Sequence, residues 1–143
     1  MIGITELTQK ITDDSRLDKT NLESEIVRTT KLFGEYLRMH FDYKKYYINS
    51  ESLLNTVVLE RQMFYNGQAE PKQYRDEPFD LVIRNGAEME RFLDGDAKIC
   101  QQRENADIAK AAIEMIKEML DMLKFRNNHI STILSVRKFE QGE

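Results

Sequence analysis

Apolar residues between positions 113 and 134 recur at alternating steps of three and four. This spacing is the heptad pattern, which keeps one edge of an α-helix apolar over many turns. Seven residues make up what we call the heptad seam: Ile113, Leu120, Asn127 and Leu134 at a positions, and Ile116, Leu123 and Ile130 at d positions. The period does not fit a strand, so the C-terminal part of the chain is predicted to be a long helix that packs along this seam.

Asn127 is the polar member of the heptad seam. A buried asparagine at an a position lowers stability but penalises wrong registers, because each wrong register leaves its amide without a partner. This property favours defined self-association of the chain through the seam. The same seam would also suit packing against the long first helix of the same chain, and spacing alone leaves the two arrangements open.

The first half of the chain carries a second helical pattern. One stripe recurs at three- and four-residue steps and contains Leu22, Ile26, Thr30, Phe33, Leu37, Phe41, Lys44 and Ile48. Thr20 and Glu23 have the spacing of a capping box, which predicts a helix start. The pattern resumes at Leu53 and stops at Asn66-Gly67, a C-cap signal. We predict one long helix that is either continuous or broken once near Asn49-Ser50.

The prolines of the chain, Pro71 and Pro78, lie in one segment between the two helical halves. Proline ends helices and pushes the preceding residue toward extended structure, so this segment is predicted to be a central loop. Short helices follow it, and Asp96 is a suitable N-cap for the next helical region. The predicted fold is all-α, in a single domain with N-terminal helices over residues 1–67, a loop region over 68–86, and C-terminal helices, including the seam helix, over 87–143.

The composition limits the class of protein. The 143 residues carry a formal net charge of -4, and an acidic protein does not coat nucleic acid through bulk charge. Any contact with nucleic acid must therefore come from local patches. The single cysteine, Cys100, excludes an internal disulfide and indicates a reducing compartment, and we expect it to be a small buried residue. Because neither a signal peptide nor a run of about 18 apolar residues occurs, we expect a cytoplasmic protein without a membrane partner.

The sequence lacks the motifs of common catalytic and metal sites. Its six glycines are scattered singly, so no phosphate-binding loop is present. His40 and His129 lie far apart, neither belongs to a metal-binding motif, and neither lies near Cys100 in sequence to act as its base. We predict no enzymatic activity, no metal and no cofactor.

Two local patches carry positive charge. The first is DYKKYY, residues 42–47, which places three tyrosines on one side of a helix with Lys44 and Lys45 beside them. Rings that stack on bases and lysines that neutralise phosphates suit single-stranded nucleic acid. Burial of the same rings against a neighbouring helix or subunit is the alternative.

The second patch, which we call the basic tail, lies between residues 122 and 139 and contains no acidic residue. Its cations are Lys124, Arg126, Arg137 and Lys138. In a chain of negative net charge, this segregation favours an anionic partner. Cations near the end of a helix also complement the helix dipole.

Matches to one family lie at both ends of the chain. The C-terminal segment LDMLKFRNNHISTILSVRKFEQGE carries Leu120, Asp121, Lys124, Arg126, Ile130, Ile133, Arg137, Phe139, Glu140 and Gly142 in the family pattern, without a gap. The first half contributes Leu17-Asp18-x-Thr20-x-Leu22, Lys44-Lys45 and Phe64-Tyr65-Asn66-Gly67, and the centre contributes Glu88-Met89, Leu93 and Asp96. Through these residues the chain resembles the UvsY family, the recombination mediators of T-even bacteriophages and their relatives.

The resemblance implies an all-helical protein that assembles into a ring-like or open-barrel homo-oligomer, a hexamer or heptamer. It also implies binding of single-stranded DNA together with the phage recombinase and the phage single-stranded-DNA-binding protein, in the cytoplasm of the infected bacterium. Such a mediator promotes loading of the recombinase onto DNA that the binding protein covers. A helical oligomeric scaffold that binds only proteins is the alternative, and salt-sensitive binding of oligonucleotides distinguishes the two.

The DNA-binding segment of the family has a lysine, one residue, an arginine, two residues and an aromatic pair. Arg61, Phe64 and Tyr65 match the arginine and the aromatic pair, whereas Leu59 replaces the lysine and Glu60 follows it. We expect other side chains to compensate for the missing phosphate contact. The residues expected to contribute to DNA binding are Arg61, Phe64, Tyr65, Lys44, Lys45, Tyr43, Tyr47, Lys72 and Arg75, and the basic tail is a further candidate to compensate.

Overall fold

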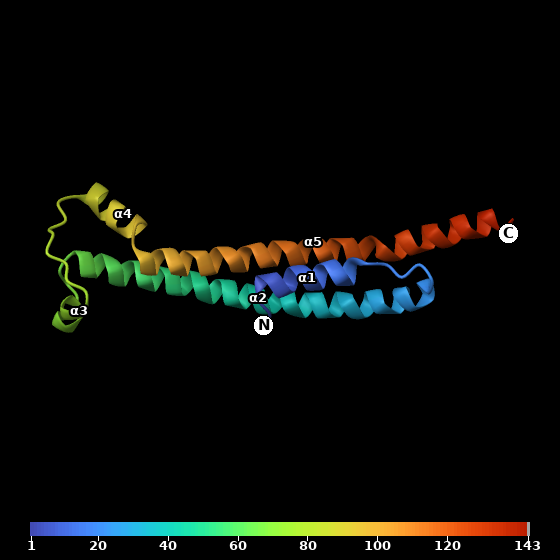
Figure 1. Cartoon of the computed structure of the whole chain (residues 1–143), viewed down its shortest axis with the longest axis horizontal. Helices are drawn as coiled ribbons and strands as arrows, with labels where there is room; N and C mark the ends of the chain where they lie inside the picture. Colours follow the sequence, from blue (N-terminus) through green and yellow to red (C-terminus); the bar gives the residue numbers. More distant parts are fainter. Residues whose placement is uncertain (143) are drawn as a thin grey trace. The chain divides into compact units, whose positions relative to one another are not determined.

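The computed structural model describes residues 1–142, and no strand occurs among them. The helices are, in chain order, α1 (Ile4–Ser15), α2 (Leu22–Tyr65), α3 (Pro71–Asp76), α4 (Gly86–Asp94) and α5 (Ala97–Glu140) (Figure 1). The prediction of an all-α fold with a long N-terminal and a long C-terminal helix is therefore confirmed. The short helix α1 is an additional element that the sequence patterns did not indicate.

Helix α2 runs for 44 residues and is continuous through Asn49-Ser50. Its start differs from the predicted capping box. The backbone N–H of Ser24 donates to Asn21 Oδ1 at 3.2 Å, whereas the Thr20 hydroxyl donates to Asp18. The capping-box prediction is wrong because Asn21, an equally good N-cap, starts the helix instead.

The predicted end of α2 and the predicted cap of α5 are both confirmed. Gly67 has φ 77°, its N–H donates to Phe64 O, and the N–H of Gln68 donates to Met63 O. These two bonds form a Schellman motif, which requires the left-handed conformation that glycine adopts without strain. At the start of α5, Asp96 Oδ1 accepts hydrogen bonds from the N–H groups of the second and third helical residues.

The chain divides into two compact units. The first unit comprises Met1–Lys45 and Lys110–Glu143, and the second comprises Tyr46–Ala109. The first unit thus holds α1 with one part of α2 and one part of α5, whereas the second holds the remainder of the two long helices with α3 and α4. The single-domain interpretation of the sequence stays a prediction.

The core of the first unit is built by three helical segments, and α1 lies along the two long helices there (Figure 1). Its buried members are Leu7 of α1, Leu32, Tyr36 and Tyr43 of α2, and Ala112, Ile116, Met119, Leu120 and Leu123 of α5. Burying a large apolar side chain of this kind contributes roughly 1.5–3 kcal/mol. Apolar burial between helices distant in sequence therefore holds the first unit together.

The heptad seam contributes to this core within one chain. Ile116, Leu120, Leu123 and Ile130 are buried, Ile113 and Leu134 are half-buried, and Asn127 is exposed. The arrangement left open by the spacing, in which the seam packs against other helices of the same chain, is the one present in the first unit. The preceding residue, Arg126, takes the buried polar position that the heptad pattern assigned to Asn127. An oligomerisation role for the seam residues stays a prediction.

The buried face of α2 in the first unit differs from the predicted stripe. Leu37 and Phe41, two members of that stripe, are 48% and 62% exposed. The buried face shares Leu22 with that stripe, and its other members are Glu25, Thr29, Leu32, Tyr36 and Tyr43. This face also follows three- and four-residue steps, but two of its members are polar, so hydropathy alone does not reveal it.

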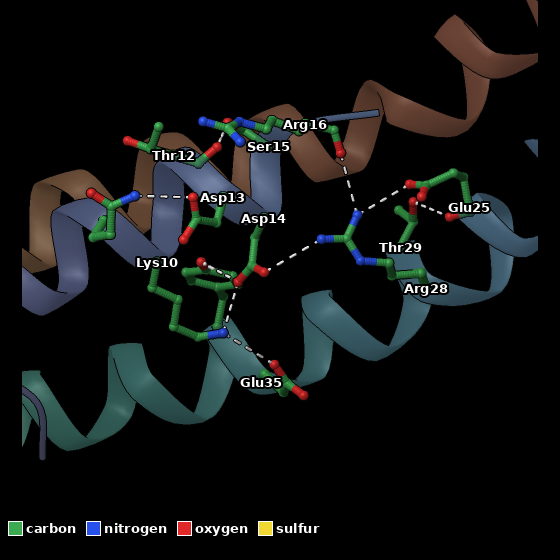
Figure 2. Close-up of polar contacts among 12 residues, drawn as sticks. Lys10, Thr12, Asp13, Asp14, Ser15, Arg16, Glu25, Arg28, Thr29 and Glu35 are labelled. Carbon is green, nitrogen blue, oxygen red and sulfur yellow. Dashed lines mark hydrogen bonds and ion pairs between the residues drawn. The ribbon is translucent and has the colours of Figure 1, made fainter. Parts of the chain in front are cut away.

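Polar contacts also join α1 to α2 (Figure 2). Asp14 of α1 accepts hydrogen bonds from Lys10 at 2.7 Å, from Tyr36 at 2.8 Å and from Arg28 at 3.4 Å. Burial raises the pKa of Asp14, but the hydrogen bonds from Lys10 and Tyr36 outweigh it, so the pKa lies below its ordinary value. Asp14 is therefore charged at neutral pH and fixes α1 on α2.

Candidate nucleic-acid interface

Arg61, the arginine of the expected DNA-binding segment, is buried in the second unit between two carboxylates. Its Nε donates to Asp96 Oδ2 at 2.7 Å. Its NH2 and NH1 atoms donate to Glu77 Oε1 at 2.6 Å and to Glu77 Oε2 at 3.0 Å. The guanidinium thus binds Asp96 through Nε and Glu77 through NH1 and NH2. The pair of bonds to Glu77 has the bidentate geometry that arginine also forms with phosphate.

Aromatic rings fix the position of the Arg61 guanidinium. Its central carbon lies 4.2 Å from the centroid of the Phe64 ring and 5.2 Å from that of Tyr65. The Tyr65 hydroxyl donates to Asp96 Oδ2, the atom that also accepts from Arg61. Burial lowers the pKa of Arg61, but the hydrogen bonds with Glu77, Tyr65 and Asp96 outweigh it and raise the pKa above its ordinary value. The guanidinium is therefore a permanent and well-oriented cation.

The expected aromatic pair belongs to a cluster of rings. Phe64 is buried and stacks on Tyr74 at 5.0 Å between centroids, and Tyr65 makes an edge contact with Phe79 at 5.1 Å. Phe92 of α4 packs against both Tyr65 and Phe79. The faces of Phe64 are thus occupied within the fold by Tyr74 and Arg61, and DNA binding by Phe64 and Tyr65 stays a prediction.

A groove lies beside this network in the second unit. Its volume is about 510 Å³, and its polar lining consists of Arg61, Lys98 and Glu60 with the amides of Gln73, Gln101 and Gln102. Lys98 is exposed, and its Nζ lies 4.0 Å from Glu77 Oε2. Lys98 belongs to no motif in the sequence, and the fold places it in the same groove as Arg61, with Glu77 as a shared partner. The two cations and the amides suit the phosphates and sugars of a nucleic-acid strand, whereas the Glu60 carboxylate repels phosphate.

The other cations expected to bind DNA in the second unit lie on α3. Lys72 and Arg75 are exposed. Lys72 lines a second groove of about 490 Å³ together with Lys98, Gln73 and the carboxylates of Glu70, Asp76 and Glu77. Tyr47, on α2, is half-buried. The fold therefore brings Lys72 to the same groove as Lys98, and DNA binding by these side chains stays a prediction.

The DYKKYY stretch spans the boundary between the two units, and its residues in the first unit, 42–45, divide between surface and core. Lys44 and Lys45 are exposed, and the Lys45 ammonium lies 5.5 Å from the centroid of the Phe41 ring. Tyr43 is buried, and its hydroxyl donates to Ile2 O. Of the two interpretations of this stretch, burial holds for Tyr43, whose ring is enclosed by the core and has no open face for a base.

The four cations of the basic tail have different environments. Lys124 and Lys138 are exposed, whereas Arg137 is half-buried and donates to Lys19 O at 2.7 Å. Arg126 is buried and donates to Asp14 O, to Arg16 O and to Glu25 Oε2 at 2.8, 2.8 and 2.7 Å. Because these acceptors lie within the first unit, Arg126 stabilises that unit. The exposed part of the basic tail is therefore smaller than the sequence indicates.

Three further features bear on the function. Cys100 is exposed, so the prediction of a buried cysteine is wrong: it lies next to the buried Ile99 on the outer side of α5. Within residues 1–142, no three His, Cys, Asp or Glu side chains gather in a way that would hold a metal ion. Among the same residues, no helix has the length and the apolar character that crossing a bilayer takes.

Comparison with known proteins gives a family and a fold. The family model described as "Recombination, repair and ssDNA binding protein UvsY" matches residues 10–143. Crystal structures of the bacteriophage T4 recombination mediator protein UvsY have a similar fold. The lattice type II structure has a TM-score of 0.82 at 20% identity and covers 99% of each chain. The lattice type IV structure has a TM-score of 0.82 at 21% identity and covers 96% of this chain and 99% of that one. No match is found among curated proteins.

Proposed function

Because the chain belongs to the UvsY family, whose model matches residues 10–143, we propose that it is a recombination mediator. In this proposal it binds single-stranded DNA and promotes loading of a phage recombinase onto DNA that a phage single-stranded-DNA-binding protein covers. It acts without enzymatic turnover, in the cytoplasm of the infected bacterium. The family match carries the proposal, and the groove beside Arg61 and Lys98 supplies cations suited to a strand.

The DNA-binding surface is proposed to use exposed lysines rather than the whole set of predicted residues. Lys72 and Lys98 face grooves of the second unit, and Lys44 and Lys45 are exposed on the first unit. Each of these contacts is weak, because a solvated ammonium gains little from one phosphate at physiological salt. In a chain with a net charge of -4, several subunits acting on one strand would supply the affinity through effective concentration.

Self-association is proposed to use apolar side chains that the single chain leaves exposed. On the first unit these are Val27, Leu37 and Phe41 of α2, and Met122, Phe125, Val136 and Phe139 of α5. Two different apolar faces on one chain suit a head-to-tail contact, which closes into a ring when the rotation between subunits permits it. A hexamer or heptamer is the expected product. Phe125→Glu should lower the mass measured by light scattering, whereas Asn128→Glu on the same helix should leave it unchanged.

Fluorescence anisotropy of a labelled oligonucleotide tests DNA binding directly. We expect single-stranded DNA to bind in preference to duplex of equal length, with little dependence on sequence and with affinity that falls steeply as salt rises. Lys72→Ala and Lys44→Ala should each weaken binding and reduce the salt dependence. Absence of binding at low salt would contradict the proposal.

A scaffold that binds only proteins is the second candidate. It is favoured by the net charge and by Arg61, whose donors are taken up by Asp96 and Glu77. Such a scaffold would not bind oligonucleotides at any salt concentration but would still bind the recombinase. Anisotropy and a recombinase pull-down on the same preparation therefore separate the two functions.

A further inference from the structure

The NH1 and NH2 groups of Arg61 bind a carboxylate of the chain itself, that of Glu77. Both oxygens of Glu77 accept from the guanidinium, and the Lys98 ammonium lies 4.0 Å from one of them. Arginine binds phosphate oxygens with the same planar pair of donors. Glu77 therefore occupies an anion site that two cations form at the edge of the groove.

The two carboxylates on Arg61 are held with different strength by the fold. The Asp96 side chain is 2% exposed, caps α5 through Oδ1 and accepts from Tyr65 through Oδ2. The Glu77 side chain is 45% exposed and lies in the segment that follows α3. A solvated carboxylate on a half-exposed ion pair exchanges for another anion at small cost, whereas Asp96 does not. An incoming anion would thus replace Glu77 and leave Asp96 in place.

The position of α3 does not depend on Glu77. The Tyr74 hydroxyl donates to Phe64 O at 2.7 Å and accepts from the N–H of Ala69 at 3.1 Å, and its ring stacks on Phe64. These contacts fix α3 on the end of α2. The Glu77 side chain can therefore leave Arg61 without detaching α3, and a substitution of Glu77 that keeps its size is compatible with the fold.

We propose that Arg61 and Lys98 bind a backbone phosphate of single-stranded DNA, and that Glu77 occupies this site in the free protein until the phosphate displaces it. The proposal rests on the proposed function, since it names the contact and its internal competitor. Exchange of one anion for another keeps the buried guanidinium paired throughout. It also makes each phosphate contact weak and readily reversed, as a protein that passes DNA to a recombinase requires.

The first test removes the charge of the competitor. In Glu77→Gln, the anisotropy titration should show single-stranded DNA bound about fivefold more tightly, because the phosphate no longer displaces an anion. The slope of the plot of log K against log salt should stay the same, because both chains make the same phosphate contact once the strand is bound. Glu90→Gln, an exposed position of α4, changes the net charge equally and should alter affinity less than twofold and leave the slope unchanged.

The second test uses Lys98→Ala, which alters an exposed side chain. The loss of affinity should be larger in the Glu77→Gln background than in the wild-type chain, where the loss of Lys98 also weakens the competing pair. Equal effects of Glu77→Gln and Glu90→Gln, or additive effects of Glu77→Gln and Lys98→Ala, would overturn this proposal while the proposed function stands. If neither the wild-type chain nor Glu77→Gln binds DNA, the proposed function itself is overturned.

Discussion

Replacement of Arg126 by alanine is expected to destabilise the first unit rather than to remove a DNA contact. The Arg126 side chain is 4% exposed and its donors serve two backbone carbonyls near the end of α1 and the buried Glu25. Removing one partner of a buried ion pair costs about 3–5 kcal/mol, because the other charge stays buried. Glu25 retains Arg28 at 3.2 Å, so we expect Arg126→Ala to lower the free energy of unfolding by about 3 kcal/mol, at the low end of that range.

Urea unfolding followed by circular dichroism, at a fixed chain concentration, measures this loss. Lys124→Ala is the matched control, since Lys124 is exposed and pairs with Asp121 only at 3.6 Å along the same helix, and it should change the free energy of unfolding by less than about 0.5 kcal/mol. Oligonucleotide affinity per folded chain should be equal for Arg126→Ala and the wild type. An Arg126→Ala chain that is as stable as Lys124→Ala but binds DNA weakly would refute the structural assignment.

Three further outcomes follow from the second unit and are measured by unfolding titrations. Burial raises the pKa of Asp96, but hydrogen bonds from Tyr65 and Arg61 outweigh it and hold the pKa below its ordinary value of 3.8. The charged Asp96 therefore stabilises the fold above pH 3.8, and this contribution is lost as pH falls through the pKa of the folded state. Asp96→Asn should have a lower free energy of unfolding at neutral pH, and that free energy should fall less on acidification than in the wild type. Gly67→Ala has open space around the new methyl group but keeps φ at 77°, and should cost about 1 kcal/mol. Tyr74→Phe removes the bond to Phe64 O and should cost about 1–2 kcal/mol. Unchanged stability in any of the three would contradict the corresponding contact.

The long helices could be predicted from the sequence because their signals are local. Three- and four-residue steps, a glycine C-cap and an aspartate N-cap each involve neighbours within one or two turns. The α5 seam gave four buried residues correctly for the same reason. Asn127 and Arg126 are adjacent, and the apolar pattern did not distinguish which of them faces inward, since neither is apolar.

The face that α2 buries could not be predicted because its polar members have distant partners. Glu25 is buried through Arg126, which lies 101 positions away in the chain, and Thr29 donates to Glu25 O. Without that pairing, a stripe that contains a glutamate and a threonine has the pattern of a solvated face, and hydropathy favours the more apolar neighbouring stripe with Leu37 and Phe41. Arg61 has the same difficulty, since its partners Asp96 and Glu77 lie 35 and 16 positions away.

The burial of two arginines changes what the surface charge can do. Arg61 and Arg126 together satisfy three carboxylates and two carbonyls of the chain, so neither adds an uncompensated charge to the surface. Lysines that stay exposed, such as Lys72 and Lys98, are strongly hydrated and bind phosphates as point charges without fixed geometry. A surface of this kind would hold a strand loosely at each position and tolerate any sequence. A contact with fixed geometry would form only where an internal carboxylate leaves its arginine, as we propose for Glu77. The release of Glu77 would then set the order in which contacts with the strand form and break.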